Sequence, residues 1–181
     1  RTRAERYTRS MLQLSGMIVG KPVLSLRTGR PVAVITQPII NPNNLKIEGF
    51  YVLDNRDKSE LILLVQDIRE IISKGFVVND HGVLAEAEDL VRLKDILALN
   101  FVLDGKPVDT TGGKRLGKLI DYAVDGSSMY IQKLYVGQSL LKSFTGGQLS
   151  VDRSQIHEIT MKRIIINDPL EKGAVPVAAA A

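Results

Sequence analysis

A short stretch that occurs twice strongly constrains what this chain can fold into. Gly20-Lys21-Pro22-Val23 returns as Gly105-Lys106-Pro107-Val108. Downstream of each copy the apolar, glycine and acidic positions run in parallel. They pair as Gly29 with Gly113, Ile35 with Leu119, Tyr51 with Tyr135, Ile68 with Ile156 and Asp80 with Asp168. Length differences fall between the apolar segments, where loops absorb insertions at little cost. The chain is therefore expected to contain two copies of one structural unit.

Short runs of alternating apolar and polar residues predict the strands of each unit. In the first copy these runs are 23–26, 30–40, 47–53, 60–65, 68–73 and 75–79. Alternation over 47–53 places Phe50 and Val52 on one face and Tyr51 on the other. The run 60–65 is almost wholly apolar, which is typical of a strand covered on both faces. About five or six short strands in each copy favour a small barrel over a sandwich.

Two segments predict helices by the spacing of their apolar residues. They are 3–14, before the first copy, and 86–100, where Leu90, Leu93 and Leu97 share one stripe. We therefore expect an all-β protein of two tandem small barrels with a short α lead-in and a bridging helix. The expected parts are a basic arm or short helix (1–13), a first barrel (14–81), the bridging helix (82–100), a second barrel (101–169) and an Ala/Pro-rich tail (170–181).

The composition excludes several classes of stabilisation and chemistry. The chain of 181 residues has no cysteine, so disulfides, thiolate metal sites and cysteine nucleophiles are excluded. No apolar run approaches the roughly 18 to 20 residues that a membrane-spanning helix needs. We expect a soluble, cytoplasmic protein.

The net charge of +4 is concentrated at the N-terminus, where Arg1, Arg3, Arg6 and Arg9 stand against one glutamate. Such an arm can track phosphates or an anionic lipid surface, and the alternative is a solvated tail. A second group of candidate phosphate contacts is Lys114, Arg115 and Lys118. Nucleic acid is thus a possible but weaker partner.

Motifs associated with catalysis are weak in this chain. Gly112 to Lys118 satisfies the spacing of a phosphate-binding loop, but Leu119 stands where Mg²⁺ coordination needs Ser or Thr, and a strand is expected to follow. We interpret the segment as a β-turn. His81 and His157 are too few for a zinc site, and Asp121, Asp125 and Asp152 are interpreted as turn residues. No catalytic residue, metal ligand or cofactor is expected, and the protein is predicted not to be an enzyme.

The second copy resembles a known family in the segments "GKPVDTTGGKRLGKLIDYAVD", "IQKLYV" and "RSQIHEI". Their pattern is similar to the PRC-barrel domain, the module named after the H subunit of the photosynthetic reaction centre. Gly105, Val108, Gly113, Gly117 and Asp121 match its glycine turns and strands. The first copy departs from the pattern, since Ala33 replaces a glycine and Gln37 an aspartate. The resemblance implies a fold and carries no catalytic residue.

The resemblance also implies a role, because PRC-barrel proteins, among them a small-subunit ribosome maturation factor, act as assembly or docking modules. We therefore expect a non-catalytic adaptor that binds protein partners within a larger complex. The candidate partner-binding residues are Tyr51, Tyr135, Leu140, Leu141 and Phe144. Tyrosine suits an interface because it joins a large contact area to a polar tip, although both tyrosines could instead cover the barrels. The alternative is an RNA- or ribosome-associated maturation factor that uses the basic arm. A third hypothesis is an enzyme or small-ligand binder with a site between the barrels.

Overall fold

Two mixed β-sheets make up most of this computed structural model, which describes residues 12–137 and 148–168. The all-β class predicted from the sequence is confirmed, and one of the sheets curls into a half-barrel. Each sheet joins one antiparallel series of strands to a parallel pair, β2 with β7 and β8 with β13. Among the described residues no helix is long and apolar enough to cross a membrane.

The first sheet has the strand order β5-β4-β3-β2-β7-β6. Its strands are β2 (Pro22–Ser25), β3 (Pro31–Asn41), β4 (Lys46–Asp54), β5 (Glu60–Leu64), β6 (Ile68–Ile72) and β7 (Gly75–Val78). The 3-10 turn η2 (Val65–Asp67) joins β5 to β6. Phe50 and Val52 are fully buried while Tyr51 is only half-buried, as the alternation predicted. Leu61, Ile62 and Leu63 are all buried, so β5 is covered on both faces.

The second sheet repeats this order as β11-β10-β9-β8-β13-β12, with β1 paired to β9 in addition. Its strands are β1 (Leu12–Leu14), β8 (Pro107–Thr110), β9 (Arg115–Asp125), β10 (Ile131–Gly137), β11 (Gln148–Asp152), β12 (Ile156–Ile159) and β13 (Ile164–Ile166). The 3-10 turn η6 (Arg153–Gln155) stands where η2 stands in the first sheet. The matching strand orders confirm the repeat.

The opening Gly-Lys-Pro-Val stretches adopt one conformation in both copies. Gly20 and Gly105 have φ of +85° and +74°, in the left-handed region that favours glycine. The amide of Gly20 donates to the carbonyl of Ile35 at 2.8 Å, and the amide of Gly105 donates to that of Leu119 at 3.0 Å. Each stretch therefore forms the turn that leads into the first strand of its repeat.

Two compact units divide the described chain. The first comprises residues up to Leu103 together with Asp121–Lys133, and the second comprises Asp104–Ile120 with the residues from Leu134 onward. The end of the β9–β10 hairpin thus belongs to the first unit although it lies in the second repeat. There Ile47 N donates to Met129 O at 2.8 Å, and Ile131 N donates to Leu45 O at 2.9 Å.

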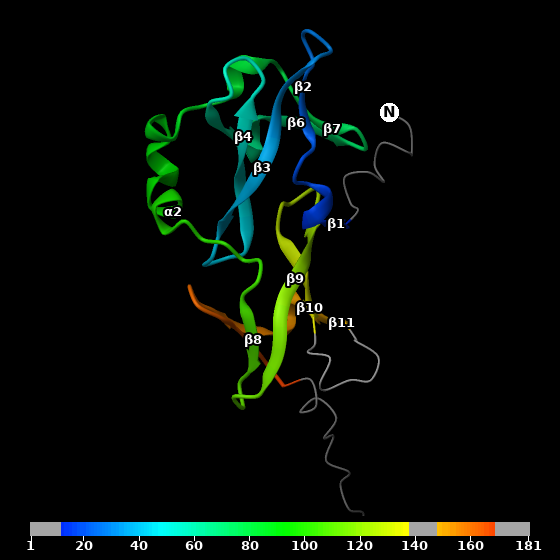
Figure 1. Ribbon diagram of the computed structural model, residues 1–181, viewed down its shortest axis with the longest axis vertical. Helices are drawn as coiled ribbons and strands as arrows, with labels where there is room; N and C mark the ends of the chain where they lie inside the picture. Colours follow the sequence, from blue (N-terminus) through cyan, green and yellow to red (C-terminus); the bar gives the residue numbers. More distant parts are fainter. Residues whose placement is uncertain (1–11, 138–147, 169–181) are drawn as a thin grey trace, which may run out of the picture. The chain divides into compact units, whose positions relative to one another are not determined.

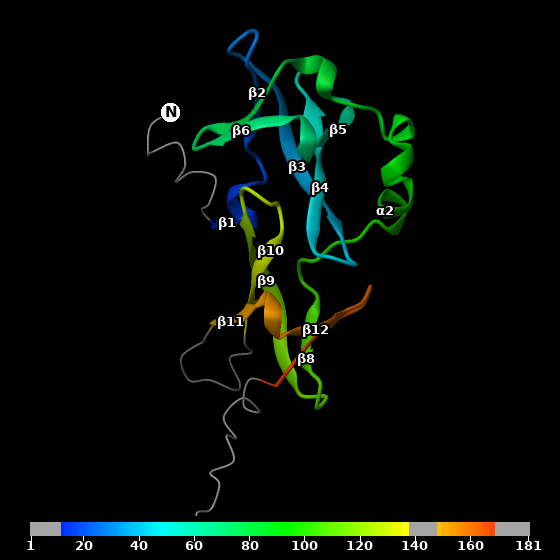
Figure 2. The same cartoon turned by 180° about the vertical axis from the view of Figure 1, so that it is seen from behind.

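The helical predictions are only partly matched. Residues 86–100 contain the 3-10 turns η4 (Ala87–Asp89) and η5 (Val91–Leu93), followed by the short helix α2 (Lys94–Leu99). A continuous helix fails because Leu90, between the two turns, has non-helical φ and ψ of −93° and 63°. Asn100 ends α2 in the left-handed conformation. Figures 1 and 2 show α2 standing beside β3 and β4.

The lead-in helix predicted over 3–14 also differs from the structure at its end. Leu12–Leu14 forms strand β1, which pairs antiparallel with residues 123–125 of β9. Backbone pairing with β9 outweighs the helical spacing of the apolar residues in this stretch. The 3-10 turn η1 (Ser15–Met17) follows β1. The rest of the predicted helix lies outside the described residues.

Candidate functional site

A groove in the first unit, with a volume of about 770 Å³, is the candidate site. One wall is the η4–η5 segment and the other is formed by β4, the end of β5 and the β9–β10 turn. Its lining residues are Lys46, Glu48, Leu64, Val65, Gln66, Asp89, Leu90, Val91, Arg92, Leu93, Ser127 and Ser128. The groove therefore combines five aliphatic side chains with two cations and two anions.

The η4–η5 wall is held in place by a short backbone bridge. Ile62 N donates to Ala85 O at 2.8 Å, and Ala85 N donates back to Ile62 O at 3.0 Å. The 3-10 turn η3 (His81–Val83) first redirects the chain after β7, so that Ala85 reaches the edge of β5. Residues 87–93 then run on as turns, which leaves Val91 79% exposed and the aliphatic side of the groove accessible.

Charged groups in the groove are partly paired with their neighbours. Lys46 Nζ lies 3.7 Å from Glu48 Oε2 and 6.0 Å from the centroid of the Tyr130 ring. Asn41 Nδ2 donates to Glu48 Oε1 at 3.3 Å. These contacts orient the Lys46 and Glu48 side chains on the strand wall, whereas Asp89 and Arg92 are exposed on the turn wall.

A second hollow next to the groove has a volume of about 240 Å³. Val65 and Ser127 line both hollows, and the smaller one extends along β6 past Ile68 and Met129. The two hollows therefore adjoin one another at η2 and the β9–β10 turn.

The serines of this site form hydrogen bonds within their own turn. The hydroxyls of Ser127 and Ser128 donate to Asp125 Oδ1 at 2.5 and 3.1 Å, and the amides of both residues donate to the same oxygen. The Ser127 hydroxyl bond, opposed by burial and helped by the amides, lowers the pKa of Asp125. The interpretation of Asp125 as a turn residue is confirmed, and Asp152 similarly forms a capping box with Gln155. The same interpretation is wrong for Asp121, which lies within strand β9 and accepts hydrogen bonds from Ser15.

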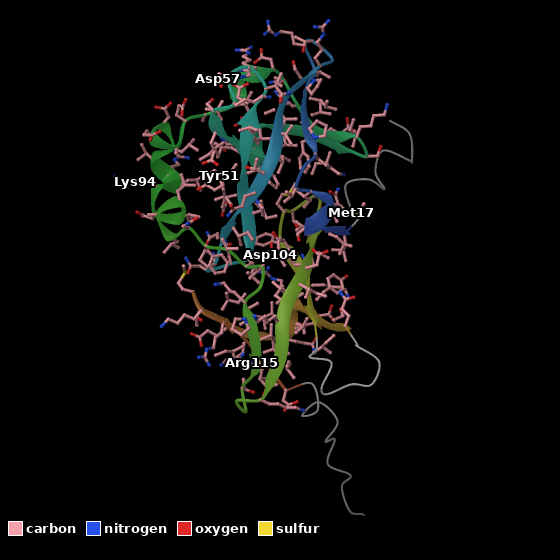
Figure 3. All side chains as sticks on the ribbon, viewed as in Figure 1. Met17, Tyr51, Asp57, Lys94, Asp104 and Arg115 are labelled. Atoms are coloured by element: carbon pink, nitrogen blue, oxygen red, sulfur yellow. The ribbon has the colours of Figure 1, made fainter. Side chains whose placement is uncertain are left out.

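The predicted interface tyrosines lie on half-buried outer faces. Tyr51 lies in β4 and lines a small hollow with Ile96 and Leu97 of α2, and Figure 3 shows it between the strands and the helix. Burial and the nearby charge of Glu60 raise the pKa of Tyr51. Tyr135 is half-buried in β10. Leu140, Leu141 and Phe144 lie outside the described residues, so partner binding by these five residues stays a prediction.

The predicted phosphate contacts of the second unit lie in and beside one turn. Lys114 is exposed in the β8–β9 turn, and Arg115 and Lys118 are exposed on β9. Gly113 N donates to Thr110 O at 2.9 Å, and Thr110 N donates to Lys114 O at 2.9 Å. The turn ends where β9 begins at Arg115, so the β-turn interpretation is confirmed for the first part of 112–118 and the rest of the segment is strand. Arg1, Arg3, Arg6 and Arg9 lie outside the described residues.

Sequence reasoning missed two buried carboxylates and their partners. Asp109 is paired with Arg115 and with Arg163, whose Nη1 lies 3.3 Å from Asp109 Oδ2. Asp54 is paired with His81, with 2.6 Å between Oδ2 and Nε2. The hairpin spacing of Asp109 and Arg115 was a usable signal, because residues on either side of a two-stranded turn face each other. Arg163 and His81 are distant in sequence and gave no such signal.

Comparison with known proteins does not assign this chain to a family. No protein-family model matches it, and neither does any curated protein. The resemblance to PRC-barrel domains therefore stays a prediction that depends on the sequence segments quoted above. The function is argued below from the geometry of the groove and from that resemblance.

Proposed function

We propose that the protein is a non-catalytic adaptor whose first unit binds a segment of a partner protein in the groove between η4–η5 and β4–β5. The observation that carries this proposal is the composition of the groove: aliphatic side chains line it together with four charged groups of both signs. An apolar centre with a polar rim is the usual anatomy of a protein–protein contact.

The shape of the groove supports a peptide segment as its occupant. A volume of about 770 Å³ would also hold a small molecule. However, a second hollow adjoins the groove at Val65 and Ser127, and Val91 on the turn wall of the groove is 79% exposed. A small ligand would be buried on most sides, whereas an extended segment leaves one side open. This chain resembles PRC-barrel proteins, which act as docking modules, and that resemblance also supports binding of a partner protein.

Substituting Val91 tests this function. Val91→Glu places a charge on the apolar wall of the groove, and the exposure of Val91 in a 3-10 turn leaves the fold intact. We expect a partner captured from the native cells by the wild-type protein to bind at least about 10-fold more weakly to the variant, since hot-spot side chains contribute more than about 1 kcal/mol. Photo-crosslinking from position 91 identifies the bound segment.

Val19→Glu is the matched control. Val19 is also exposed, at 45%, and lies outside the lining of the groove. It should bind the partner as the wild type does, and both variants should melt at the wild-type temperature. Equal loss of binding in the two variants, or full binding by Val91→Glu, contradicts the proposed docking groove.

A further inference from the structure

Two arginines share one buried carboxylate in the second unit. Asp109 is only 6% exposed, and it is paired through Oδ1 with Arg115 Nε and through Oδ2 with Arg163 Nη1. The arginine side chains remain 56% and 52% exposed. The buried carboxylate of Asp109 therefore holds both guanidinium groups, while the arginine side chains remain about half exposed to solvent.

Strand register explains why these groups meet. Asp109 of β8 lies opposite Arg115 of β9 and beside Ile165 of β13. Arg163 precedes Ile165 by two residues, and alternation returns its side chain to the same face. Lys118 pairs with Pro107, two residues before Asp109, so it belongs to that face as well. We call Arg115, Lys118 and Arg163 the basic face.

The basic face carries an excess of positive charge. One carboxylate offsets one of the three cations, which leaves two. Each guanidinium group has five N–H donors in a planar fork, and Asp109 accepts from one donor of each arginine. Both arginine side chains are more than half exposed, so other donors remain accessible to a ligand from solvent. Arginine forks of this kind match the oxygen atoms of phosphate groups.

We propose that the basic face binds the phosphodiester backbone of a nucleic acid, a function beyond the docking of a protein segment. The spacing of the cations selects a polyanion over a single phosphate. Arg115 and Lys118 are three residues apart on one strand, or about 10 Å, and Arg163 extends the face onto a neighbouring element. Lys114 continues it into the β8–β9 turn.

Fluorescence anisotropy with a labelled single-stranded RNA of about 12 nucleotides tests the proposal. We expect the full chain to bind this RNA at low salt, with a log–log salt slope near −2, since each neutralised phosphate contributes about −0.7 and three cations contact the strand. Arg163→Gln should weaken binding about 3- to 10-fold and reduce the slope by about 0.7. Absence of wild-type binding at low salt overturns the proposal.

Arg30→Gln is the matched control, because it makes the same change in net charge at an exposed site of the first unit. We expect it to change the affinity less than about 1.5-fold, because Arg30 is not part of the basic face and an isolated exposed charge is screened by salt. An effect as large as that of Arg163→Gln would show that net charge alone attracts the RNA, and it would overturn the assignment to this face.

Asp109→Asn tests whether RNA binding depends on the fixed positions of the two arginines or only on the net positive charge of the chain. This change makes the chain more positive, so simple attraction predicts tighter binding. The proposal predicts weaker binding, because the two arginines lose their common anchor. If Asp109→Asn lowers the melting temperature, the comparison of Arg163→Gln with Arg30→Gln decides whether the RNA binds at the basic face. A phosphoserine peptide should bind at least about 10-fold more weakly than the RNA, and equal binding of the two overturns the choice of nucleic acid.

Discussion

At the scale of single residues, Asp54 and His81 form a largely buried ion pair in the first unit. Asp54 is 3% exposed, and its Oδ2 lies 2.6 Å from His81 Nε2 while its Oδ1 accepts from the Arg56 amide at 2.9 Å. Burial raises the pKa of Asp54, but the bonds from Arg56 and His81 outweigh it and leave the pKa below its ordinary value. The pair therefore ties η3 to the end of β4.

His81→Gln tests this link through the pH dependence of stability. A lowered folded-state pKa contributes stability that is present above the unfolded-state value of about 3.9 and is lost as pH falls through the folded-state pKa. Without His81 the folded-state pKa of Asp54 rises toward the unfolded-state value, so the variant starts from a lower stability and loses less of it than the wild type does as pH falls. We expect the variant to lose about 1–3 kcal/mol at neutral pH, measured by urea denaturation between about pH 3 and 7.

His157→Gln is the control for this prediction, because His157 is exposed on β12 and is the only other histidine of the chain. Its unfolding free energy should follow the wild-type curve at every pH. Asp57, which Figure 3 labels in the β4–β5 turn, also has a pKa lowered by its hydrogen bonds with Ser59, so it is kept unchanged in both variants. If His81→Gln shows the wild-type acid profile, the ion pair does not stabilise the fold.

At the scale of elements, the β9–β10 pair depends on a close approach of two glycines. A Cβ added at Gly117 would overlap the carbonyl oxygen of Gly137 and come within 3.2 Å of Val136 Cγ1. A carbonyl in a paired strand cannot withdraw without breaking the pairing. The first repeat has Ala33 at the position of Gly117 and Leu53 at that of Gly137, so this approach is specific to the second repeat.

Gly117→Ala should therefore destabilise the second unit strongly. We expect a loss of about 3 kcal/mol or more in the free energy of unfolding, from overlap with the backbone of β10. Gly113→Ala is the comparison, because Gly113 has φ of +80° but nothing within 4 Å of an added Cβ. Its cost should be about 1 kcal/mol, from the left-handed conformation alone. Equal costs measured by urea denaturation would contradict the role assigned to the close approach.

The elements were predictable from sequence where local pattern decides them. Alternation placed β3 and β4 within one or two residues of their ends because a half-buried strand must alternate. The helix over 86–100 was predicted too long, because apolar spacing does not report the backbone conformation of Leu90. Arg163 reaches Asp109 only through the parallel pairing of β13 with β8, which joins segments more than 50 residues apart. The groove likewise depends on tertiary contacts that no local pattern encodes.

At the scale of the whole molecule, the β9–β10 hairpin contributes to both compact units. Residues 121–133 belong to the first unit, while the rest of both strands belongs to the second. Within the first unit, Asp121 Oδ1 accepts from Ser15 N at 3.0 Å and from Ser15 Oγ at 2.5 Å. Tyr122, Val124 and Ile131 are each at most 1% exposed. The first repeat therefore completes its core with residues that the sequence places in the second.

Shortening this hairpin tests whether the first unit needs its end. Replacing residues 122–131 by a two-residue Asp-Gly turn keeps a hairpin but removes the buried side chains. We expect the first unit to lose at least about 3 kcal/mol, because truncating one large buried side chain costs about 2–5 kcal/mol. Hydrogen exchange should show lost protection at the amides of β3 and β4.

Inserting two glycines into the exposed 27–30 turn is the control and should leave that protection unchanged, because the turn carries no buried side chain. Full protection of β3 and β4 in the shortened variant would mean that the first repeat is stable without the hairpin end.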